Sequence, residues 1–189
     1  MTGVVVEVGS GKDVSRCRSA VVTVGPGETV VVPMTGKIAA AKIWSLEERN
    51  LYRLATVVES VGKAVDQDET RFGVRTLAWD GQRGFLLNRK VVKIKGTCNH
   101  QDHAGVGVAV PDAIQWYRIE RLKDMNCNGL RTAHNTPAAE VLDACDELGV
   151  LVMDETRMFS SSVEGLRALR IETGVLNRFT SSNWFEDGL

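Results

Sequence analysis

The sequence lacks the patterns that mark several large classes of protein. Its 23 Lys and Arg residues are balanced by 24 Asp and Glu residues, which leaves a net charge of −1 and no long basic run. This balance argues against a partner held by charge, such as a nucleic acid or an anionic membrane. No apolar stretch approaches the roughly 20 residues of a membrane-spanning helix. The first residues, M-T-G-V-V-V-E-V-G, also lack the basic start and cleavage site of a signal peptide. We therefore expect no nucleic-acid partner, no membrane association and a cytoplasmic location.

Cysteine is sparse and irregularly placed. The four cysteines are Cys17, Cys98, Cys127 and Cys145, and no two of them form a C-x-x-C pair. This spacing excludes a zinc knuckle and does not indicate a disulfide framework. Buried free thiols are the better interpretation, and they suit a reducing compartment.

The sequence does contain enough apolar residues to build a core, because 43% of its residues are hydrophobic and 25% are charged. The first part of the chain is rich in short β-type segments separated by turns. The predicted strands and hairpin arms are Val4–Val8, Ala20–Val24, Thr29–Val32, Tyr52–Glu59, Ala64–Thr70 and Val74–Trp79. Several short strands without a convincing helix predict an antiparallel sandwich of the immunoglobulin-like kind.

From Gly84 onward the pattern changes to alternating strands and helices. A small hairpin across Asn88–Lys90 leads into an apolar strand that is expected to end at Gly96. Helices are predicted at about 113–125, with Asp112 as a plausible cap, and at 138–148, stopped by Gly149. Short apolar strands are predicted at 130–132 and 150–153. Strand–loop–helix units at this spacing indicate a parallel sheet with right-handed crossovers.

Ionisable side chains follow three successive predicted strands. They are His100 and His103 after the first, Arg131 and His134 after the second, and Asp154 and Glu155 after the third. Because the carboxyl ends of parallel strands meet at one edge, these groups are expected to gather there. The alternative is structural, with a buried Arg bonded to carbonyl groups and a His capping the next helix. A single pair favours that alternative, whereas three successive strand ends make a functional site an equally good interpretation.

Several motifs together resemble glycoside hydrolase family 2, most closely its bacterial β-galactosidase branch. They occur in the family's order over roughly residues 18–166. The matching segments are I-W-S-L-E-E-R-N-L-Y-R-L (43–54), E-T-R-F-G-V-R-T (69–76), G-F-L-L-N (84–88), K-G-T-C-N-H-Q-D-H (95–103), N-G-L-R-T-A-H-N-T-P (128–137) and L-D-A-C-D-E-L-G-V-L-V-M-D-E (142–155). Thr136 departs from the pattern, because the family usually has proline there.

The resemblance implies an immunoglobulin-like β-sandwich followed by a (β/α)₈ TIM barrel. On this basis residues 1–82 form the sandwich, residues 83–166 form the first three β/α units of the barrel, and residues 167–189 form an off-pattern tail. A complete barrel takes about 250 residues, so the chain is expected to be a fragment.

The resemblance also implies retaining hydrolysis of terminal β-linked sugars by two glutamates, one protonated and one ionised. It places His100 and His134 against the sugar, and Arg131 beneath the nucleophile, which it helps to keep ionised. Asn99, Asp102 and Glu155 match neighbouring substrate-binding positions. The expected partner is a β-galactoside or a related sugar, and a homo-oligomer is compatible with the full-length family.

The catalytic glutamates themselves have no match. The family's acid/base lies in an Asn-Glu pair, and the 189 residues contain no such pair. Glu172 and Glu186 are carboxylates outside that motif. Family members often hold magnesium, but its ligands have no clear match after Asp154, so we expect no metal or other cofactor on this chain alone.

Three interpretations remain open at this stage. The chain is either a catalytically incomplete piece of a β-galactosidase-like hydrolase or a non-catalytic carbohydrate-binding or interaction module. In a third, weaker interpretation, another chain supplies the missing strands and both glutamates.

Overall fold

The computed structural model describes residues 1–155. These residues form two compact units, which are taken one at a time below. The first holds residues 1–76 and the short stretch 146–149, and the second holds residues 77–145 and continues from residue 150. The predicted tail at 167–189 lies outside the described residues, as do Glu172, Glu186 and the end of the predicted barrel segment.

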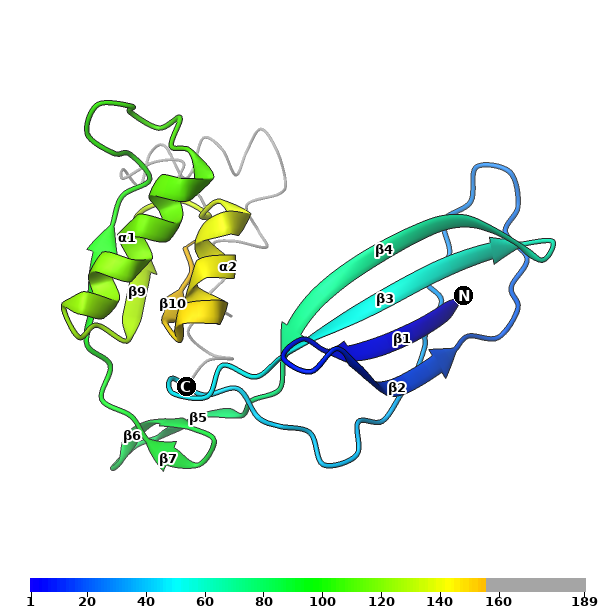
Figure 1. The fold of residues 1–189 in the computed structure, drawn as a ribbon, viewed down its shortest axis with the longest axis horizontal. Coiled ribbons are helices and arrows are strands. Elements are labelled where there is room, and N and C mark those ends of the chain that lie inside the picture. The colour runs from blue at the N-terminus through cyan, green and yellow to red at the C-terminus, as the bar shows by residue number, and fades with distance from the viewer. Residues whose placement is uncertain (156–189) are drawn as a thin grey trace, which may run out of the picture. The chain divides into compact units, whose positions relative to one another are not determined.

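The first unit is built on one antiparallel sheet with the strand order β2-β1-β3-β4 (Figure 1). Its strands are β1 (Thr2–Glu7), β2 (Lys12–Arg18), β3 (Leu51–Ser60) and β4 (Lys63–Gly73). Val61 and Gly62 join β3 to β4 with φ of 51° and 74°, the left-handed geometry of a tight hairpin turn. The predicted hairpin between these two strands is therefore confirmed.

The two valine-rich runs in this unit are not strands, contrary to prediction. Residues 20–24 and 29–32 belong to a long connection between β2 and β3, and Val21 and Val31 are 97% and 92% exposed. The strand Lys12–Arg18, which pairs with β1, was not predicted. Valine favours a strand only where a neighbouring strand and a packed face receive it, and these runs have no ladder partner among residues 1–155.

The core of the first unit lies where β3 and β4 pack against the segment before β3, which contains Trp44. Trp44 and Tyr52 are both 1% exposed, and the ring of Tyr52 stacks on Phe72 at 5.7 Å. Gly73 lets β4 approach the indole closely, since a Cβ there would lie 3.1 Å from Trp44 Cβ. The guanidinium of Arg75 lies over the same indole at 4.6 Å. The I-W-S and R-F-G-V-R segments of the sequence therefore supply the residues that pack together in this core.

The second unit begins with a small antiparallel ribbon of β5 (Leu77–Asp80), β6 (Gly84–Leu87) and β7 (Lys90–Val91). Asn88 and Arg89 turn between β6 and β7 with φ of 52° and 67°, which confirms the predicted small hairpin. The predicted strand Val74–Trp79 was expected to be the last strand of the sandwich. It is instead replaced by β5, which pairs with β6.

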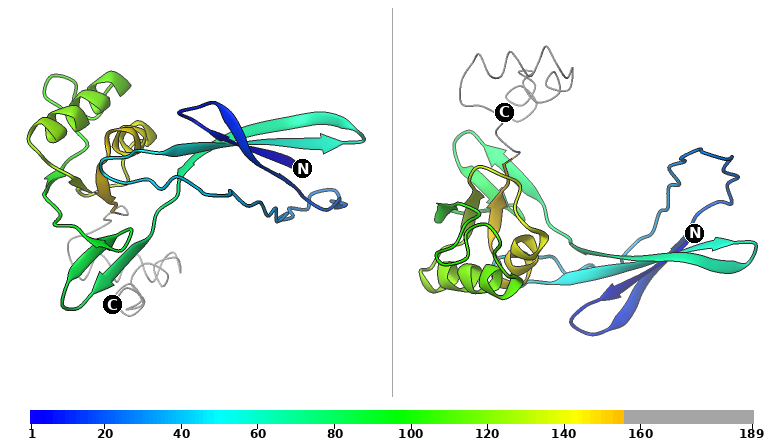
Figure 2. Two further views of the ribbon diagram at one scale, coloured as in Figure 1. Left: turned by 60° about the horizontal axis from the view of Figure 1, so that its bottom comes forward. Right: turned by 90° about the horizontal axis from the view of Figure 1, so that it is seen from above.

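The rest of this unit alternates strands and helices. The elements are β8 (Gly96–Asn99), α1 (Asp112–Asp124), β9 (Gly129–Thr132), α2 (Ala139–Leu148) and β10 (Leu151–Met153). The three strands are parallel in the order β10-β9-β8, and both helices lie on the same face of that sheet (Figure 2). Strand β8 starts at Gly96, where the sequence predicted a strand to end.

Glycine and asparagine bring β8 and β9 together. A Cβ on Gly96 would lie only 2.4 Å from the carbonyl oxygen of Gly129, so no larger residue fits without moving a strand. The side chain of Asn128 accepts a hydrogen bond from the Lys95 N–H at 2.7 Å and donates one to the Lys93 carbonyl at 3.1 Å. These contacts set the register that brings the ends of β8 and β9 level.

The helices cover the sheet with apolar side chains. The buried residues of this layer are Ile119, Leu122, Leu130, Ala144, Cys145, Val150 and Leu151. Pro111 caps α1 without a side-chain hydrogen bond, and Asp112 is its first helical residue, so the prediction that Asp112 caps the helix was wrong. Gly149 follows α2 with φ of 74°, as expected for the residue that stops it.

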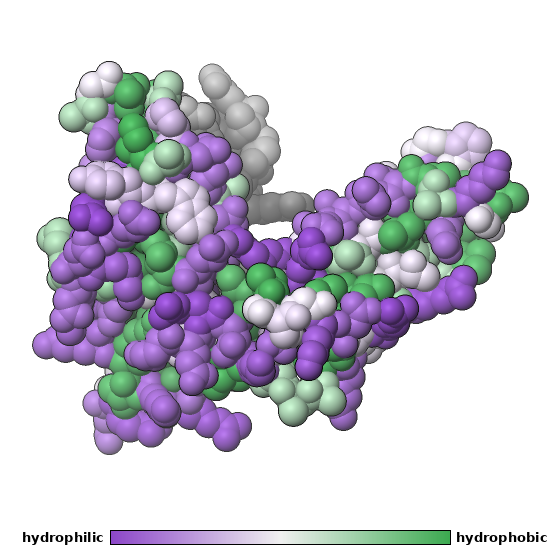
Figure 3. All heavy atoms as spheres, viewed as in Figure 1, coloured by the Kyte–Doolittle hydropathy of each residue, from purple (hydrophilic) through white to green (hydrophobic). Residues whose placement is uncertain are grey.

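The cysteines and the surface complete the description. All four cysteines are free, as predicted, but Cys98 is exposed rather than buried, and Cys145 is buried. Figure 3 shows polar residues over much of the visible surface, interrupted by apolar patches. Among the residues described, no helix is long and apolar enough to cross a membrane.

Candidate functional site

The candidate site lies where the parallel strands of the second unit end. Their register aligns Asn99 at the end of β8 with Thr132 at the end of β9, and Met153 at the end of β10 with Arg131. The residues that follow each strand therefore meet at one edge. Four of the six predicted site residues, His100, Arg131, His134 and Glu155, are joined there by direct contacts.

Glu155 is the centre of these contacts. Its Oε2 lies 2.9 Å from His134 Nδ1, and its Oε1 forms an ion pair with Arg131 Nε. The backbone N–H of Glu155 donates to Thr132 Oγ1 at 3.0 Å, and the Thr132 hydroxyl donates to Asp154 at 3.1 Å. Both ends of the residue are therefore anchored to β9 or to the segment that follows it.

The charges in this cluster reinforce one another. The hydrogen bond from His134 lowers the pKa of Glu155, burial opposes the shift, and the positive charge of Arg131 adds to it. The contact with Cys98 is the main factor that raises the pKa of Arg131, and the charge of Glu155 adds to it. Near neutral pH, Glu155 is thus an anion and Arg131 a cation.

The contact with Glu155 also fixes the proton on His134. A carboxylate can only accept, so Nδ1 of His134 carries the proton in this hydrogen bond. In the neutral ring Nε2 is then left as an acceptor. The His100 ring meets the His134 ring edge-on, with centroids 5.5 Å apart and planes at 84°. Two imidazole groups are thus held side by side at the strand edge.

The remaining two predicted residues are placed differently. Asn99 accepts a hydrogen bond from the Thr97 hydroxyl at 2.7 Å, and it points to the helix side of the sheet together with residues that line a hollow there. Asp102 is exposed in the loop after β8. Among residues 1–155, no side-chain hydrogen bond or ion pair joins either residue to the Glu155 cluster.

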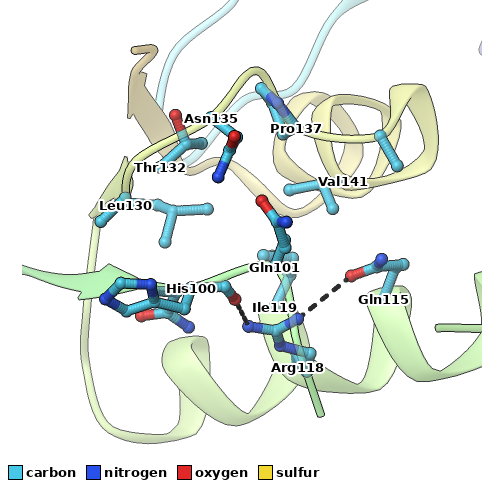
Figure 4. A pocket seen from close by; sticks show the side chains of 13 residues that line it. His100, Gln101, Gln115, Arg118, Ile119, Leu130, Thr132, Asn135, Pro137 and Val141 are labelled. Atoms are coloured by element: carbon cyan, nitrogen blue, oxygen red, sulfur yellow. Dashed lines mark hydrogen bonds between the residues drawn. The ribbon is translucent and has the colours of Figure 1, made fainter. Parts of the chain in front are cut away.

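The hollow beside Asn99 lies between α1, α2 and β9 (Figure 4). It has about 430 Å³ of space that opens to solvent, with an apolar floor that includes Leu130 and Val141. Its polar wall holds Gln101, Gln115, Arg118 and Asn135, together with His100 and Thr132. Arg131 and Glu155 are not among its lining residues, whereas His100 and Thr132 belong to both the hollow and the charged cluster, so the two adjoin at the end of β9.

Sequence reasoning missed three residues of this region. Thr132 and Cys98 contact Glu155 and Arg131, and Arg118 of α1 contacts the backbone of His100. Thr132 could have been suspected, since it lies between Arg131 and His134 on the same strand end. Nothing in the sequence pairs Arg118 with His100, because that contact depends on how α1 lies against the loop.

Among residues 1–155, no three His, Cys, Asp or Glu side chains lie close enough together to hold a metal ion. Asp154 and Glu155 engage Thr132, Arg131 and His134 instead.

Comparison with known families matches both units. A profile described as "Glycosyl hydrolases family 2, TIM barrel domain" matches residues 80–183, and a second, described as "Glycosyl hydrolases family 2", matches residues 4–75. The first of these two matches covers more than half of the chain.

Individual relatives agree with these matches. A β-galactosidase of Bacteroides ovatus is 37% identical over 145 residues, which are 77% of this chain and 17% of the relative. A putative β-glucuronidase of Formosa agariphila is 40% identical over 119 residues, or 63% of this chain and 12% of the relative. The crystal structure of a glycosyl hydrolase family 2 member from Bacteroides cellulosilyticus superposes with a TM-score of 0.73 at 31% identity, covering 82% of this chain and 20% of that one. The chain thus spans only about a fifth, or less, of the length of these proteins.

Proposed function

The chain belongs to glycosyl hydrolases family 2, and from that premise we propose that its second unit forms the sugar-facing part of a retaining β-galactosidase-like site. The observation that supports the proposal is the Glu155 cluster, in which Arg131 and His134 converge on one carboxylate at the carboxyl ends of parallel strands. That edge is where the active sites of (β/α)₈ barrels lie.

Each residue has a role that follows from its contacts. His134, held by Glu155 through Nδ1, offers Nε2 to a sugar hydroxyl, and His100 offers a second imidazole beside it. The positive charge of Arg131 lowers the pKa of any carboxyl group that approaches it, which suits a nucleophile that must stay ionised. Asn99 and Asp102 remain secondary candidates, because their contacts do not reach the cluster.

The charge of the cluster favours a neutral sugar over a sugar acid. Arg131 already pairs with Glu155 through Nε and donates from Nη1 to Cys98 at 3.4 Å. A uronate carboxylate that entered here would meet Glu155 as a second negative charge. We therefore propose a neutral sugar such as a β-galactoside rather than a β-glucuronide, although relatives with both names exist.

Hydrolysis by the chain alone is not expected. A retaining enzyme needs two carboxyl groups about 5 Å apart, of which the general acid has a raised pKa. The pKa of Glu155 is lowered instead, and its oxygens are taken by Arg131 and His134. We propose that the family's acid/base and nucleophile glutamates are absent from the 189 residues. Release of a chromophore from an aryl β-galactoside by the purified chain would disprove this.

Binding tests the proposal directly. Calorimetry with a galactose-configured iminosugar should show binding to the chain, and His134→Ala and His100→Ala should each weaken it. His103→Ala is the matched control, because the backbone of His103 pairs with Gly107 within the loop. Tighter binding of a glucuronate-configured inhibitor would refute the sugar assignment. Equal binding by all three variants would refute the site.

A non-catalytic carbohydrate-binding module is the second candidate. It is favoured by the same observation, namely a polar sugar-facing cluster whose one central carboxylate cannot act as a general acid. The two candidates predict different results when this chain is produced together with a separate chain that supplies the remaining barrel strands and both glutamates. Co-purification with activity that neither chain has alone supports the hydrolase, whereas sugar binding without any such gain supports the module.

A further inference from the structure

Arg118 of α1 is the residue that links the helix layer to the start of the sugar-site loop. Its Nη2 donates to the backbone carbonyl of His100 at 2.5 Å, and its Nη1 lies 3.5 Å from Gln115 Oε1 (Figure 4). Gln115 is only 7% exposed, one turn earlier on the same helix. The guanidinium of Arg118 is thus held by Gln115 on its own helix while it donates a hydrogen bond to the His100 carbonyl.

The bonded carbonyl lies at the point where the chain leaves β8. The next residues, 101–110, carry two glycines with positive φ, Gly105 and Gly107. The backbone hydrogen bonds shown within this stretch join His103, Val106 and Gly107 to one another. These bonds hold the loop together internally. The bond from Arg118 instead connects the carbonyl of His100, just before the loop, to α1.

That carbonyl belongs to a residue whose ring forms part of the candidate site. The His100 ring lies against the His134 ring at 5.5 Å, and His134 bonds Glu155 at 2.9 Å. A rotation of the His100 backbone would carry its imidazole away from His134. The hydrogen bond from Arg118 opposes that rotation from the helix side.

We propose that Arg118 is a positioning residue that fixes the backbone of His100 and thereby holds the two imidazole rings edge to edge for the sugar. The inference rests on the proposed function for its purpose, but the geometry it predicts can be measured without a sugar. Arginine suits the role because its planar fork bonds two acceptors in fixed directions, whereas lysine offers a single flexible point of charge.

Three variants separate positioning from general stability. Arg118→Met keeps most of the apolar stem and removes both hydrogen bonds, and Arg118→Lys can restore the bond to the carbonyl. Arg121→Met is the matched control on the same helix, since Arg121 pairs with Asp124 at 2.8 Å and lies over the Tyr117 ring. Each variant is made in the full 189-residue chain.

The primary readout is the nuclear Overhauser contact between the ring protons of His100 and His134. We expect Arg118→Met to lose it while contacts between α1 and β9 persist, Arg118→Lys to regain part of it, and Arg121→Met to keep it. Iminosugar affinity should fall about tenfold in Arg118→Met, since one hydrogen bond to a charged donor is worth roughly that factor.

Two results would overturn the inference. An unchanged ring contact in Arg118→Met would show that His100 needs no brace, and joint loss of the ring contact and the α1–β9 contacts would show a structural role only. If the unmodified chain binds no sugar, the proposed function fails, but the ring contact still decides the role of Arg118.

Discussion

Replacement of Gly96 by alanine should separate the two strands that carry the histidines. The new Cβ would lie 2.4 Å from the Gly129 carbonyl oxygen and 2.7 Å from its carbon, whereas an ordinary contact begins at 3.4 Å. Because both obstructing atoms belong to the backbone, no side chain can swing aside, and the strands must part by about 1 Å (3.4 − 2.4). Neighbouring strands are normally about 4.8 Å apart, so this shift strains their hydrogen bonds.

Forced overpacking of this kind costs about 1–3 kcal/mol. In a unit of this size each kcal/mol lowers the melting temperature by roughly 4–8 °C. The same shift should move His100 relative to His134, so sugar affinity should fall together with stability. Thermal unfolding followed by circular dichroism measures the first effect, and calorimetry with the iminosugar measures the second.

Gly81→Ala is the matched control for this experiment. It lies in the same unit, no atom comes within 4 Å of a Cβ built there, and its φ is not positive. It should therefore leave stability unchanged or raise it slightly, since alanine reduces the freedom of the unfolded chain. Equal melting temperatures for Gly96→Ala and Gly81→Ala would refute the argument that β8 and β9 need two facing glycines.

Three further predictions concern the cluster itself. Because the pKa of Glu155 is lowered in the folded chain, its contribution to stability is present above the ordinary carboxyl pKa of about 4.3 and is lost as the pH falls through the lower folded value. Glu155→Gln should therefore flatten the pH dependence of urea unfolding below about pH 5, and an unchanged slope would contradict this. Thr132→Val removes two hydrogen bonds at a residue that is 6% exposed and should cost about 1–3 kcal/mol in urea unfolding, whereas the exposed Thr136→Val should cost little. A thiol-reactive dye should label the exposed Cys98 well before the buried Cys145, as peptide mass mapping at short times would show, and the reverse order would count against the packing described.

Local sequence patterns were sufficient to predict the positions of the two helices and of the strand between them. The apolar spacing around Ile119 and Leu122 predicted α1 to within a residue at each end, and Gly149 marked the end of α2. These features depend on helix periodicity and on the left-handed backbone that glycine adopts easily. The gathering of Arg131, His134 and Glu155 at one edge also followed, because it needs only the order of parallel strands.

Strand predictions failed where the partner mattered more than the residue. Residues 20–24 and 29–32 have high β propensity, yet they form no ladder among residues 1–155, while the more polar Lys12–Arg18 pairs with β1. A strand is stabilised by its neighbour, so propensity alone misplaces it. The start of β8 was misjudged for a similar reason, since its register is set by Asn128 and by the close approach of Gly96 and Gly129.

The sequence by itself determined the lineage of this protein and the alternation of strands and helices in its second unit, because motif spacing and periodicity are local properties of the chain. It also predicted that Arg131, His134 and Glu155 would meet at the strand edge. Only the tertiary structure decided how those residues are used. It joined Glu155 to both Arg131 and His134, turned Asn99 toward the helix side, and brought Arg118 to the backbone of His100. Those contacts connect residues far apart in the chain, and their geometry follows from packing that no short stretch of sequence contains.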